Sequence, residues 1–394
     1  MSVSAVPFWL DEPYRARPAL EGRVETEVCV IGAGVAGLSC ARRLAGHGLD
    51  TVVLERGTVA GGASGRNGGF LLAGPAPFYP DARERYGAER ARRIYSRTLD
   101  AQEQMYALAE ELGVGDAVRR VGLLRVSASE KEAEHVRRHA DALRHDGFPA
   151  ELVERDSLPA VIARYARNGV LTGHDGALHP ARWIRALARD AESAGARIHE
   201  HTPVELPVAA PSEGELVTPA GSLSARHVVV TADGYLPALV PEYAGKVRSR
   251  RLHMVATAPL AERVIEPMVY SRWGYEYLQQ RPDGRVLVGG FGDLDGPASY
   301  TDSDSGSPRI WARIEQFLRN DVGLQVPTTH HWAGLVGYSD DNLPYVGEAR
   351  ERPGLWVAGG YSGHGNVPGF LSGQELADRI AGVASEPPLF PADR

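Results

Sequence analysis

The sequence predicts an α/β chain, α+β overall, with two kinds of domain. One is built on a parallel βαβ unit and assembled from discontinuous segments, and the other is a mostly antiparallel β-sheet domain with flanking helices. Three observations predict this. A strand, glycine-rich turn, helix and strand follow one another at 28–55, a similar strand, turn and helix close the chain at 355–381, and short β-branched runs occupy 197–290.

The opening unit has the order of elements that holds a dinucleotide. An apolar run at 28–31 suits a buried strand, and the glycine-rich hexapeptide 32–37 follows it. A helical stretch then runs to about His47, and a second apolar strand occupies 51–54. Both strands, the helix and the turn therefore stand in the order of a Rossmann-like unit.

The glycines and one acidic residue of this unit have separate tasks. Gly32 permits a tight turn, Gly34 lets the backbone approach a pyrophosphate, and Gly37 lets the helix pack close to the strand. The free N–H groups at the helix start would point at the phosphates. Glu55 ends the second strand, where a carboxylate can accept hydrogen bonds from ribose hydroxyls and would repel a 2′-phosphate. We therefore expect a dinucleotide other than NADP.

Composition and charge exclude several other functions. The net charge of -7 over 394 residues argues against a nucleic-acid partner. No uncharged apolar run is long enough for a membrane span, and no leader pattern is visible, so we expect a soluble, cytoplasmic protein without a membrane partner. Cys29 and Cys40 sit among apolar neighbours as core residues, and no Cys/His cluster has metal-ligand spacing, so we predict no metal.

Further elements follow in order along the chain. Mixed charges and apolar spacing predict helices, and β-branched runs between glycines and prolines predict strands. Pro282-Asp283-Gly284 reads as a hairpin turn. The expected helices are 81–112, 129–144, 180–195, one that starts at 307–308, and 368–381; the expected strands are 197–204, 215–218, 227–231, 248–257, 275–281, 285–290 and 355–358.

A second glycine-rich loop, Ala63-Ser64-Gly65-Arg66-Asn67-Gly68-Gly69, follows Glu55 closely. NAD enzymes have no obvious need for such a loop, whereas backbone amides must approach the large ring system of a flavin. Here the sequence resembles the FAD-dependent amine and amino-acid oxidase family, which includes D-amino-acid oxidase, glycine oxidase, monomeric sarcosine oxidase and γ-glutamylputrescine oxidase. The loop is most similar to the γ-glutamylputrescine oxidase branch. The segments 176–204, 228–235, 332–347 and 359–382 carry the resemblance further.

The resemblance implies a Rossmann-like FAD-binding domain made of residues 1–78, 155–240 and 336–394, and a substrate domain made of 79–154 and 241–335. It also implies FAD bound non-covalently, because Gly334 stands where related enzymes attach the flavin to a cysteine. Pyrophosphate, ribose, adenine, the flavin ring and its pyrimidine edge would each meet a separate group of residues. The implied cofactor-binding residues are Gly32, Ala33, Gly34, Val35, Ala36, Gly37, Glu55, Arg56, Gly62, Ala63, Ser64, Arg66, Asn67, Gly68, Gly69, Val204, Gly337, Gly363, His364, Gly365, Asn366 and Val367.

Substrate residues follow from the same resemblance. Tyr275 and Tyr277 lie where the family places residues that face the substrate, and we take them as the catalytic candidates. Val336 and Val367 stand where relatives carry the Arg and the Lys that hold an α-carboxylate. Glu276 is the acidic candidate for attracting a distal ammonium group.

These residues predict an FAD-dependent oxidase of a primary or secondary amine without an α-carboxylate, such as a polyamine derivative. Hydride transfer to flavin N5 would give an imine and then an aldehyde, and molecular oxygen would give hydrogen peroxide. An amino-acid oxidase that binds carboxylate through Arg66, Arg248 or Arg250 remains open. So does a dehydrogenase with another acceptor, because Leu287 replaces the lysine that assists oxygen in sarcosine oxidase. A non-catalytic flavin-binding subunit is the alternative of another class.

Overall fold

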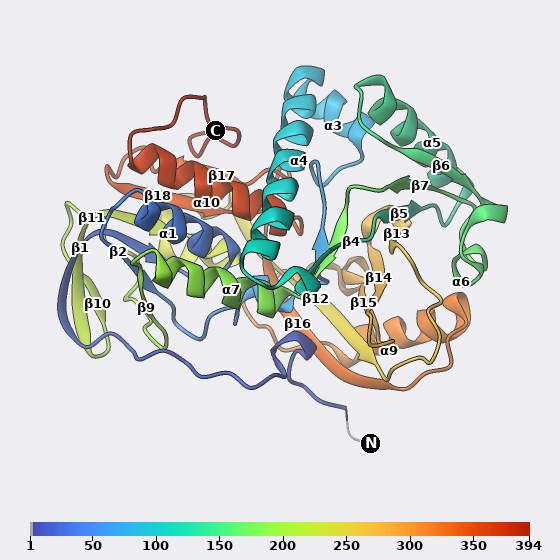
Figure 1. Ribbon diagram of the computed structural model, residues 1–394, viewed down its shortest axis with the longest axis horizontal. Helices are drawn as coiled ribbons and strands as arrows, with labels where there is room; N and C mark the ends of the chain where they lie inside the picture. The colour runs from blue at the N-terminus through green and yellow to red at the C-terminus, as the bar shows by residue number, and fades with distance from the viewer. Residues whose placement is uncertain (1–2) are drawn as a thin grey trace.

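The computed structural model describes residues 3–394, and these form two β-sheet halves with a long helix between them (Figure 1). One half contains the strand, turn and helix that open the chain and the similar strand, turn and helix that close it, and this half holds a largely parallel sheet. The other half holds a larger, mostly antiparallel sheet. The predicted fold class is confirmed.

The first sheet has the strand order β17-β18-β11-β1-β2-β9, with β10 paired to β11. All neighbours along its centre are parallel, and only β10 and β17 pair antiparallel. The strands of this sheet therefore come from three distant parts of the chain, as the discontinuous domain requires. Its strands are β1 (Gly22–Ile31), β2 (Thr51–Leu54), β9 (Arg197–His199), β10 (Leu216–Thr218), β11 (Gly221–Val230), β17 (Tyr345–Glu348) and β18 (Leu355–Gly359).

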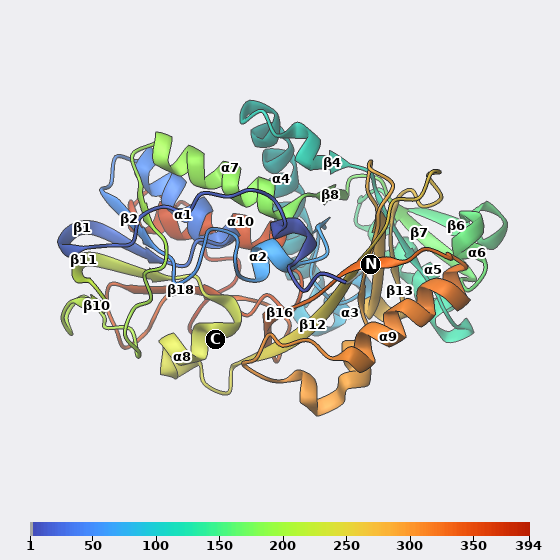
Figure 2. The same ribbon diagram turned by 90° about the horizontal axis from the view of Figure 1, so that it is seen from below.

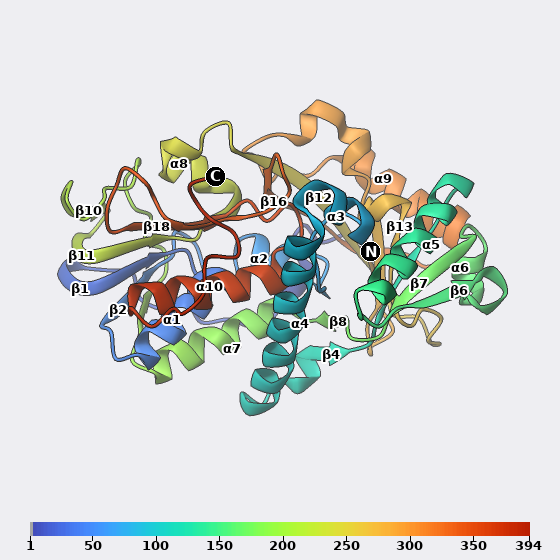
Figure 3. The same cartoon turned by 90° about the horizontal axis from the view of Figure 1, so that it is seen from above.

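Three helices lie side by side on one face of this sheet: α1 (Val35–Gly46), α7 (Pro180–Ser193) and α10 (Asn366–Ile380) (Figure 3). Helix α1 packs against both of the others. A Cβ atom at Gly373 of α10 would lie 2.3 Å from the carbonyl oxygen of Ala36, so a glycine is required for this close approach. The C-terminal helix is thereby fixed against the first helix of the chain.

The second sheet has the order β16-β12-β15-β14-β13-β5-β7-β6, and within the described residues only β13 and β5 pair parallel. Helices α9 and α5 flank it (Figure 2). Its strands are β5 (Leu123–Val126), β6 (Glu151–Glu154), β7 (Asn168–Thr172), β12 (Val247–Thr257), β13 (Met268–Ser271), β14 (Glu276–Gln280), β15 (Val286–Gly290) and β16 (Thr328–Ser339).

A small third sheet, β3-β8-β4, joins the two halves. None of the helices within residues 3–394 combines the length and hydropathy that a membrane span requires. The remaining elements are β3 (Phe70–Leu71), β4 (Val118–Arg120) and β8 (Gly176–Leu178), and the helices α2 (Ala63–Arg66), α3 (Tyr79–Tyr86), α4 (Ala88–Glu111), α5 (Glu130–His145), α6 (Ala160–Ala163), α8 (Leu236–Leu239) and α9 (Pro308–Phe317).

The sequence-based element assignment needs three corrections. The single helix expected at 81–112 is two helices, α3 and α4, which meet at Gly87 with a φ of 87°, a left-handed conformation that breaks the helix. The strand expected at 197–204 ends at His199. The sequence did not predict strands β3 to β8, β13, β16 and β17. The predicted domain division at 154/155 falls between β6 and β7, which pair with each other in the second sheet.

Candidate functional site

The glycine-rich turn after β1 has the tight geometry that its sequence predicts. Gly32 has a φ of 107°, and a Cβ atom at Gly37 would lie 1.9 Å from the carbonyl oxygen of Gly32. Only glycine fits at both positions. Gly34 caps the start of α1, so the first amides of that helix gather at the turn.

Glu55 follows β2 and is fixed beside this turn. One carboxylate oxygen accepts a hydrogen bond from the N–H of Ala33 at 2.8 Å, and the other accepts one from Gly57 at 2.8 Å. Burial raises the pKa of Glu55, and the two amides oppose that rise. The next residue, Arg56, stacks its guanidinium 3.8 Å from the ring centre of Tyr235.

Val204 belongs to a segment that lies near Glu55. The N–H of Thr202, two residues before Val204, donates to the carbonyl oxygen of Glu55 at 2.8 Å. Val204 itself is half-buried and packs at the edge of the core on this side of the sheet. The geometry therefore suits the expected contact of its backbone with the adenine, which stays a prediction.

The second glycine-rich loop folds onto the first turn through Ser64. The Ser64 Oγ accepts a hydrogen bond from the N–H of Val35 at 3.0 Å. A Cβ atom at Gly34 would lie 2.8 Å from the same oxygen, so the two loops are in direct contact. Gly62 and Ala63 form the start of the short helix α2 that carries Ser64.

Asn67 joins this loop to the C-terminal helix. Its side chain lies within 3.2 Å of the side-chain amide of Asn366, the first residue of α10, and its Oδ1 accepts from the N–H of Gly69 at 2.8 Å. Asn366 in turn donates to the carbonyl oxygen of Phe70 at 2.8 Å. Two motifs that are 299 positions apart in the sequence therefore form one wall.

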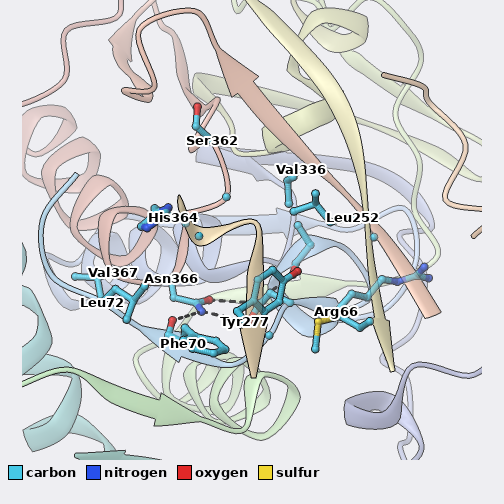
Figure 4. Close-up of a pocket in the computed structure, with 18 of the residues that line it drawn as sticks. Arg66, Phe70, Leu72, Leu252, Tyr277, Val336, Ser362, His364, Asn366 and Val367 are labelled. Carbon is cyan, nitrogen blue, oxygen red and sulfur yellow. Dashed lines mark hydrogen bonds between the residues drawn. The ribbon is translucent and has the colours of Figure 1, made fainter. Parts of the chain in front are cut away.

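A cavity of about 120 Å³ lies beside this wall, between the two halves of the molecule (Figure 4). Apolar and aromatic side chains dominate its lining. The second glycine-rich loop and the segment 362–367 contribute most of the remaining lining residues. The lining residues are Ala63, Arg66, Asn67, Gly68, Phe70, Leu72, Leu252, Met254, Tyr270, Gly274, Tyr277, Gly334, Val336, Tyr338, Ser362, Gly363, His364, Gly365, Asn366 and Val367.

The structure brings some of the predicted substrate residues to this cavity and not others. Tyr277, Val336 and Val367 line it. Glu276 does not: it is buried on the other side of β14, where it pairs with Arg272 at 2.7 Å. Successive side chains of a strand point to opposite faces, so Glu276 and Tyr277 cannot both face the cavity.

Tyr275 also lies outside the lining, because it precedes β14 in a turn and is 43% exposed. No sequence signal marked the turn at 272–274, where Arg272 and Trp273 adopt positive φ angles. These side chains reach solvent rather than the cavity. The family resemblance predicted both tyrosines to face the substrate, and only Tyr277 lines the cavity.

The lining contains two basic side chains, Arg66 and His364. Arg66 pairs with Asp304 at 2.6 Å and donates to the carbonyl oxygen of Gly61 at 2.8 Å. Burial, helped by the positive charge of Arg125, lowers the pKa of His364 to about 4. His364 is therefore neutral near pH 7, and neither of its ring nitrogens has a hydrogen-bond partner within residues 3–394.

Asp233, for which no role was predicted, organises the site from outside the cavity lining. Its Oδ2 accepts from the N–H of Gly337 at 2.8 Å, and its Oδ1 accepts from the N–H of Gly360 at 3.0 Å and of Tyr361 at 3.3 Å. This half-buried carboxylate thus connects Gly360 and Tyr361, which precede the Gly363–Asn366 segment, to β16. A sequence signal was present, since Asp233 lies shortly after the buried end of β11, within the segment 228–235 that carries the family resemblance.

Tyr270 and Tyr338 are further lining residues that sequence reasoning missed. Tyr270 lies on β13, which pairs parallel with β5, and this pairing has no local sequence pattern. Its ring centre lies 5.4 Å from the guanidinium of the buried Arg125. Burial raises the pKa of Tyr270 and of Tyr277, so both keep their hydroxyl protons.

The residues present fit an FAD molecule. The turn at Gly34 leaves no room for a side chain, and the N-terminal end of α10 supplies a partial positive charge beside Gly363 and Gly365. The orphaned ring nitrogens of His364 lie at the same end of the cavity. The pyrophosphate would meet the first loop, and the flavin ring would lie between the second loop and α10.

Comparisons with known proteins show the family to which the chain belongs. The sequence profile of the family described as DAO, FAD dependent oxidoreductase, matches residues 27–379. The probable oxidoreductase OrdL of Rhizobium meliloti (strain 1021) is 28% identical over 381 residues, covering 94% of this chain and 86% of the relative. The gamma-glutamylputrescine oxidoreductase of Escherichia coli (strain K12) is 26% identical over 387 residues, covering 94% and 87%.

The fold has solved counterparts. The crystal structure of glycine oxidase from Geobacillus kaustophilus superposes with a TM-score of 0.77 at 23% identity, covering 92% of this chain and 96% of that one. L-proline dehydrogenase from P. horikoshii gives a TM-score of 0.77 at 20% identity, covering 94% and 96%. The family match over most of the chain, together with the two glycine-rich loops, identifies the protein as a member of the DAO family of FAD-dependent oxidoreductases.

Proposed function

We propose that the protein is an FAD-dependent oxidase of a primary or secondary amine that lacks an α-carboxylate. The observation that carries the proposal is the composition of the cavity wall. Val336 and Val367 occupy the wall, and the one arginine in the lining, Arg66, is held by Asp304. Burial of a carboxylate beside these valines without a partner would cost at least several kcal/mol.

The same wall favours the neutral form of an amine. Phe70, Tyr277 and Met254 supply apolar and aromatic surface, and desolvation disfavours an ammonium ion. The guanidinium of Arg125 adds a positive charge behind Tyr270 that acts in the same direction. The protein thereby holds its substrate in the form that can be oxidised.

Bound FAD would supply the electron acceptor for the substrate carbon, and the protein would supply position and exclusion of water. The amine would lose two electrons and two protons to become an imine, which water hydrolyses to an aldehyde and ammonia or a smaller amine. The electrons would reduce molecular oxygen to hydrogen peroxide. The side chains of Tyr277 and Tyr270 keep their protons and can orient the substrate through hydrogen bonds.

The experiment compares matched substrates in the purified FAD-containing protein. Peroxide formation is measured with hexylamine and with 2-aminohexanoate, which adds only an α-carboxylate. We expect kcat/KM to be at least tenfold higher for hexylamine, a difference of about 1.4 kcal/mol. A higher kcat/KM for 2-aminohexanoate would overturn the proposal in favour of an amino-acid oxidase. Flavin reduction without peroxide would favour a dehydrogenase.

A further inference from the structure

A row of three side chains crosses the second sheet on the face that borders the cavity. In the pairing of β5, β13 and β14, Arg125 is the direct partner of Tyr270, and Tyr270 is the direct partner of Tyr277. Direct partners on neighbouring strands present their side chains on the same face. Both tyrosines line the cavity, so Arg125 is the third member of the row and lies beside Tyr270, on the side away from Tyr277.

Arg125 carries its charge in the protein interior. The residue is 8% exposed, and its Cζ lies 4.6 Å from the ring centre of Phe78 and 5.4 Å from that of Tyr270. Burial lowers the pKa of Arg125, but an arginine side chain stays protonated at neutral pH. Because the interior screens a charge less than water does, the field of this guanidinium acts over a longer range than that of a surface arginine.

The charge of Arg125 has no carboxylate in contact with it among the residues that the structure describes. Two buried carboxylates, Asp175 and Glu132, interact with it only at longer range. Asp175 accepts from the N–H of Ala73 at 2.9 Å and from the side-chain amide of Gln102 at 2.9 Å, and it lies outside the cavity lining. The two oxygens of Glu132 each accept a backbone amide. Both carboxylates are therefore held by groups other than the guanidinium.

The field of Arg125 reaches into the cavity, and no negative charge in the lining opposes it. Burial, helped by the positive charge of Arg125, lowers the pKa of the lining residue His364. No aspartate or glutamate of the described chain lines the cavity. A second guanidinium, that of Arg250 opposite Val336, lies 5.2 Å from the ring centre of the lining residue Tyr338. Positive charge thus borders the cavity on two sides.

We infer that Arg125 is a specificity-determining residue that excludes a second positive charge from the cavity, so that the substrate is a monoamine. The inference rests on the proposed oxidation of amines and narrows it: diamines and polyamines with a free second ammonium group are excluded. A second ammonium ion would lose its hydration without gaining a carboxylate, and the guanidinium would repel it. Glu276, the acidic anchor expected for such a group, is buried on the other side of β14.

The first arm of the test needs no turnover. Choline and 3,3-dimethylbutan-1-ol have nearly the same shape, but only choline carries a positive charge. Each is titrated by calorimetry into the FAD-containing protein, as wild type, Arg125→Met and Arg125→Lys. We expect wild type and Arg125→Lys to bind the alcohol at least tenfold more tightly than choline. Arg125→Met should reduce this preference at least fivefold, because tyrosine rings without the guanidinium attract a cation.

Arg119→Met is the matched control. Arg119 is a half-buried arginine on β4 that lies outside the cavity lining, so its replacement should change the preference less than twofold. An equal preference in wild type and Arg125→Met, or an equal loss in Arg119→Met, would overturn the inference. So would tighter binding of choline than of the alcohol in wild type, or no binding of either ligand.

The second arm measures oxidation of hexylamine, 6-aminohexan-1-ol and 1,6-diaminohexane. In wild type, kcat/KM should be at least tenfold higher for hexylamine and for the amino alcohol than for the diamine. Arg125→Met should narrow this gap at least fivefold, mainly through a lower KM for the diamine. A wild-type preference for the diamine would overturn the inference. If none of the three is oxidised but the preference for the neutral ligand depends on Arg125, the proposed function fails and the exclusion of positive charge stands.

Discussion

The fold fixes the side chain of Glu55 at the position where it is predicted to bind the cofactor. Its two carboxylate oxygens each accept a backbone amide, from Ala33 and from Gly57, and this fixes the carboxylate at the carboxyl end of the first sheet. Each oxygen keeps a further lone pair. The remaining acceptor capacity points to the region where a ribose would lie, next to the turn at Gly32 and Gly34.

Replacement of Glu55 by alanine should therefore reduce FAD content. Hydrogen bonds to charged groups are worth roughly 1.5 to 3 kcal/mol each, so loss of even one should weaken FAD binding at least tenfold. The measurement is FAD released by heat per mole of purified protein, which also tests non-covalent binding. Glu27→Ala is the control, because Glu27 likewise accepts a backbone amide, from Asp50 at 2.9 Å, on the same sheet. Equal FAD content in both variants would place the nucleotide elsewhere.

At the scale of elements, helix α5 is tied to the turn that borders the cavity. Ser129 caps the helix by accepting from the N–H of Glu132 at 3.3 Å. Glu132 accepts from the N–H of Ala128 at 2.7 Å and, with its other oxygen, from the N–H of Trp273 at 2.6 Å. The helix start therefore holds a turn whose next residue, Gly274, lines the cavity.

Two substitutions distinguish the two roles of the residues at the start of α5, which are to cap the helix and to hold the turn at Trp273. Ser129→Ala removes only the cap and should lower the free energy of unfolding by about 1 kcal/mol without a change in KM. Glu132→Ala also leaves the amide of Trp273 unpaired, so it should destabilise more and raise KM for the amine substrate. Urea unfolding and steady-state kinetics measure both effects. Equal stability and equal KM in the two variants would show that the turn does not depend on α5.

At the scale of the whole molecule, buried neutral histidines predict sensitivity to acid. The His253 Nε2 accepts from the N–H of Ser307 at 2.8 Å, and the His139 Nδ1 accepts from the N–H of Tyr79 at 2.9 Å. Burial lowers the pKa of His253 to about 4 and lowers that of His139 well below its usual value. Both must lose these hydrogen bonds when they take up a proton.

The sign of the pH dependence follows from these shifts. Between about pH 6.5 and pH 4 the unfolded chain binds more protons than the folded chain, so stability falls as the pH is lowered through this range. Each pKa unit corresponds to about 1.4 kcal/mol per histidine. Urea unfolding at pH 4 to 7 should show this loss, and His253→Gln should make the slope shallower, whereas the exposed His145→Gln should not. A flat profile in wild type would contradict the prediction.

The sequence by itself determined the local parts of the cofactor site. The turn at Gly32, the close approach at Gly37 and the acidic residue after β2 are set by residues within one βαβ unit. A positive φ or a missing Cβ is a property of one position, so the pattern of residues is enough to predict it. The same holds for α5, whose cap at Ser129 lies three positions from its partner. The predicted parallel sheet and the mostly antiparallel second sheet were also confirmed.

Only the tertiary structure decided which side chains share the cavity. The contact of Asn67 with Asn366, the placement of Arg250 opposite Val336, and the burial of Glu276 on the far side of β14 all depend on strand register and on chain segments far apart in the sequence. Register is set by packing of whole strands, and a shift by one residue would reverse every side chain. No local pattern contains the register of the strands. Only the fold therefore shows which side chains line the cavity.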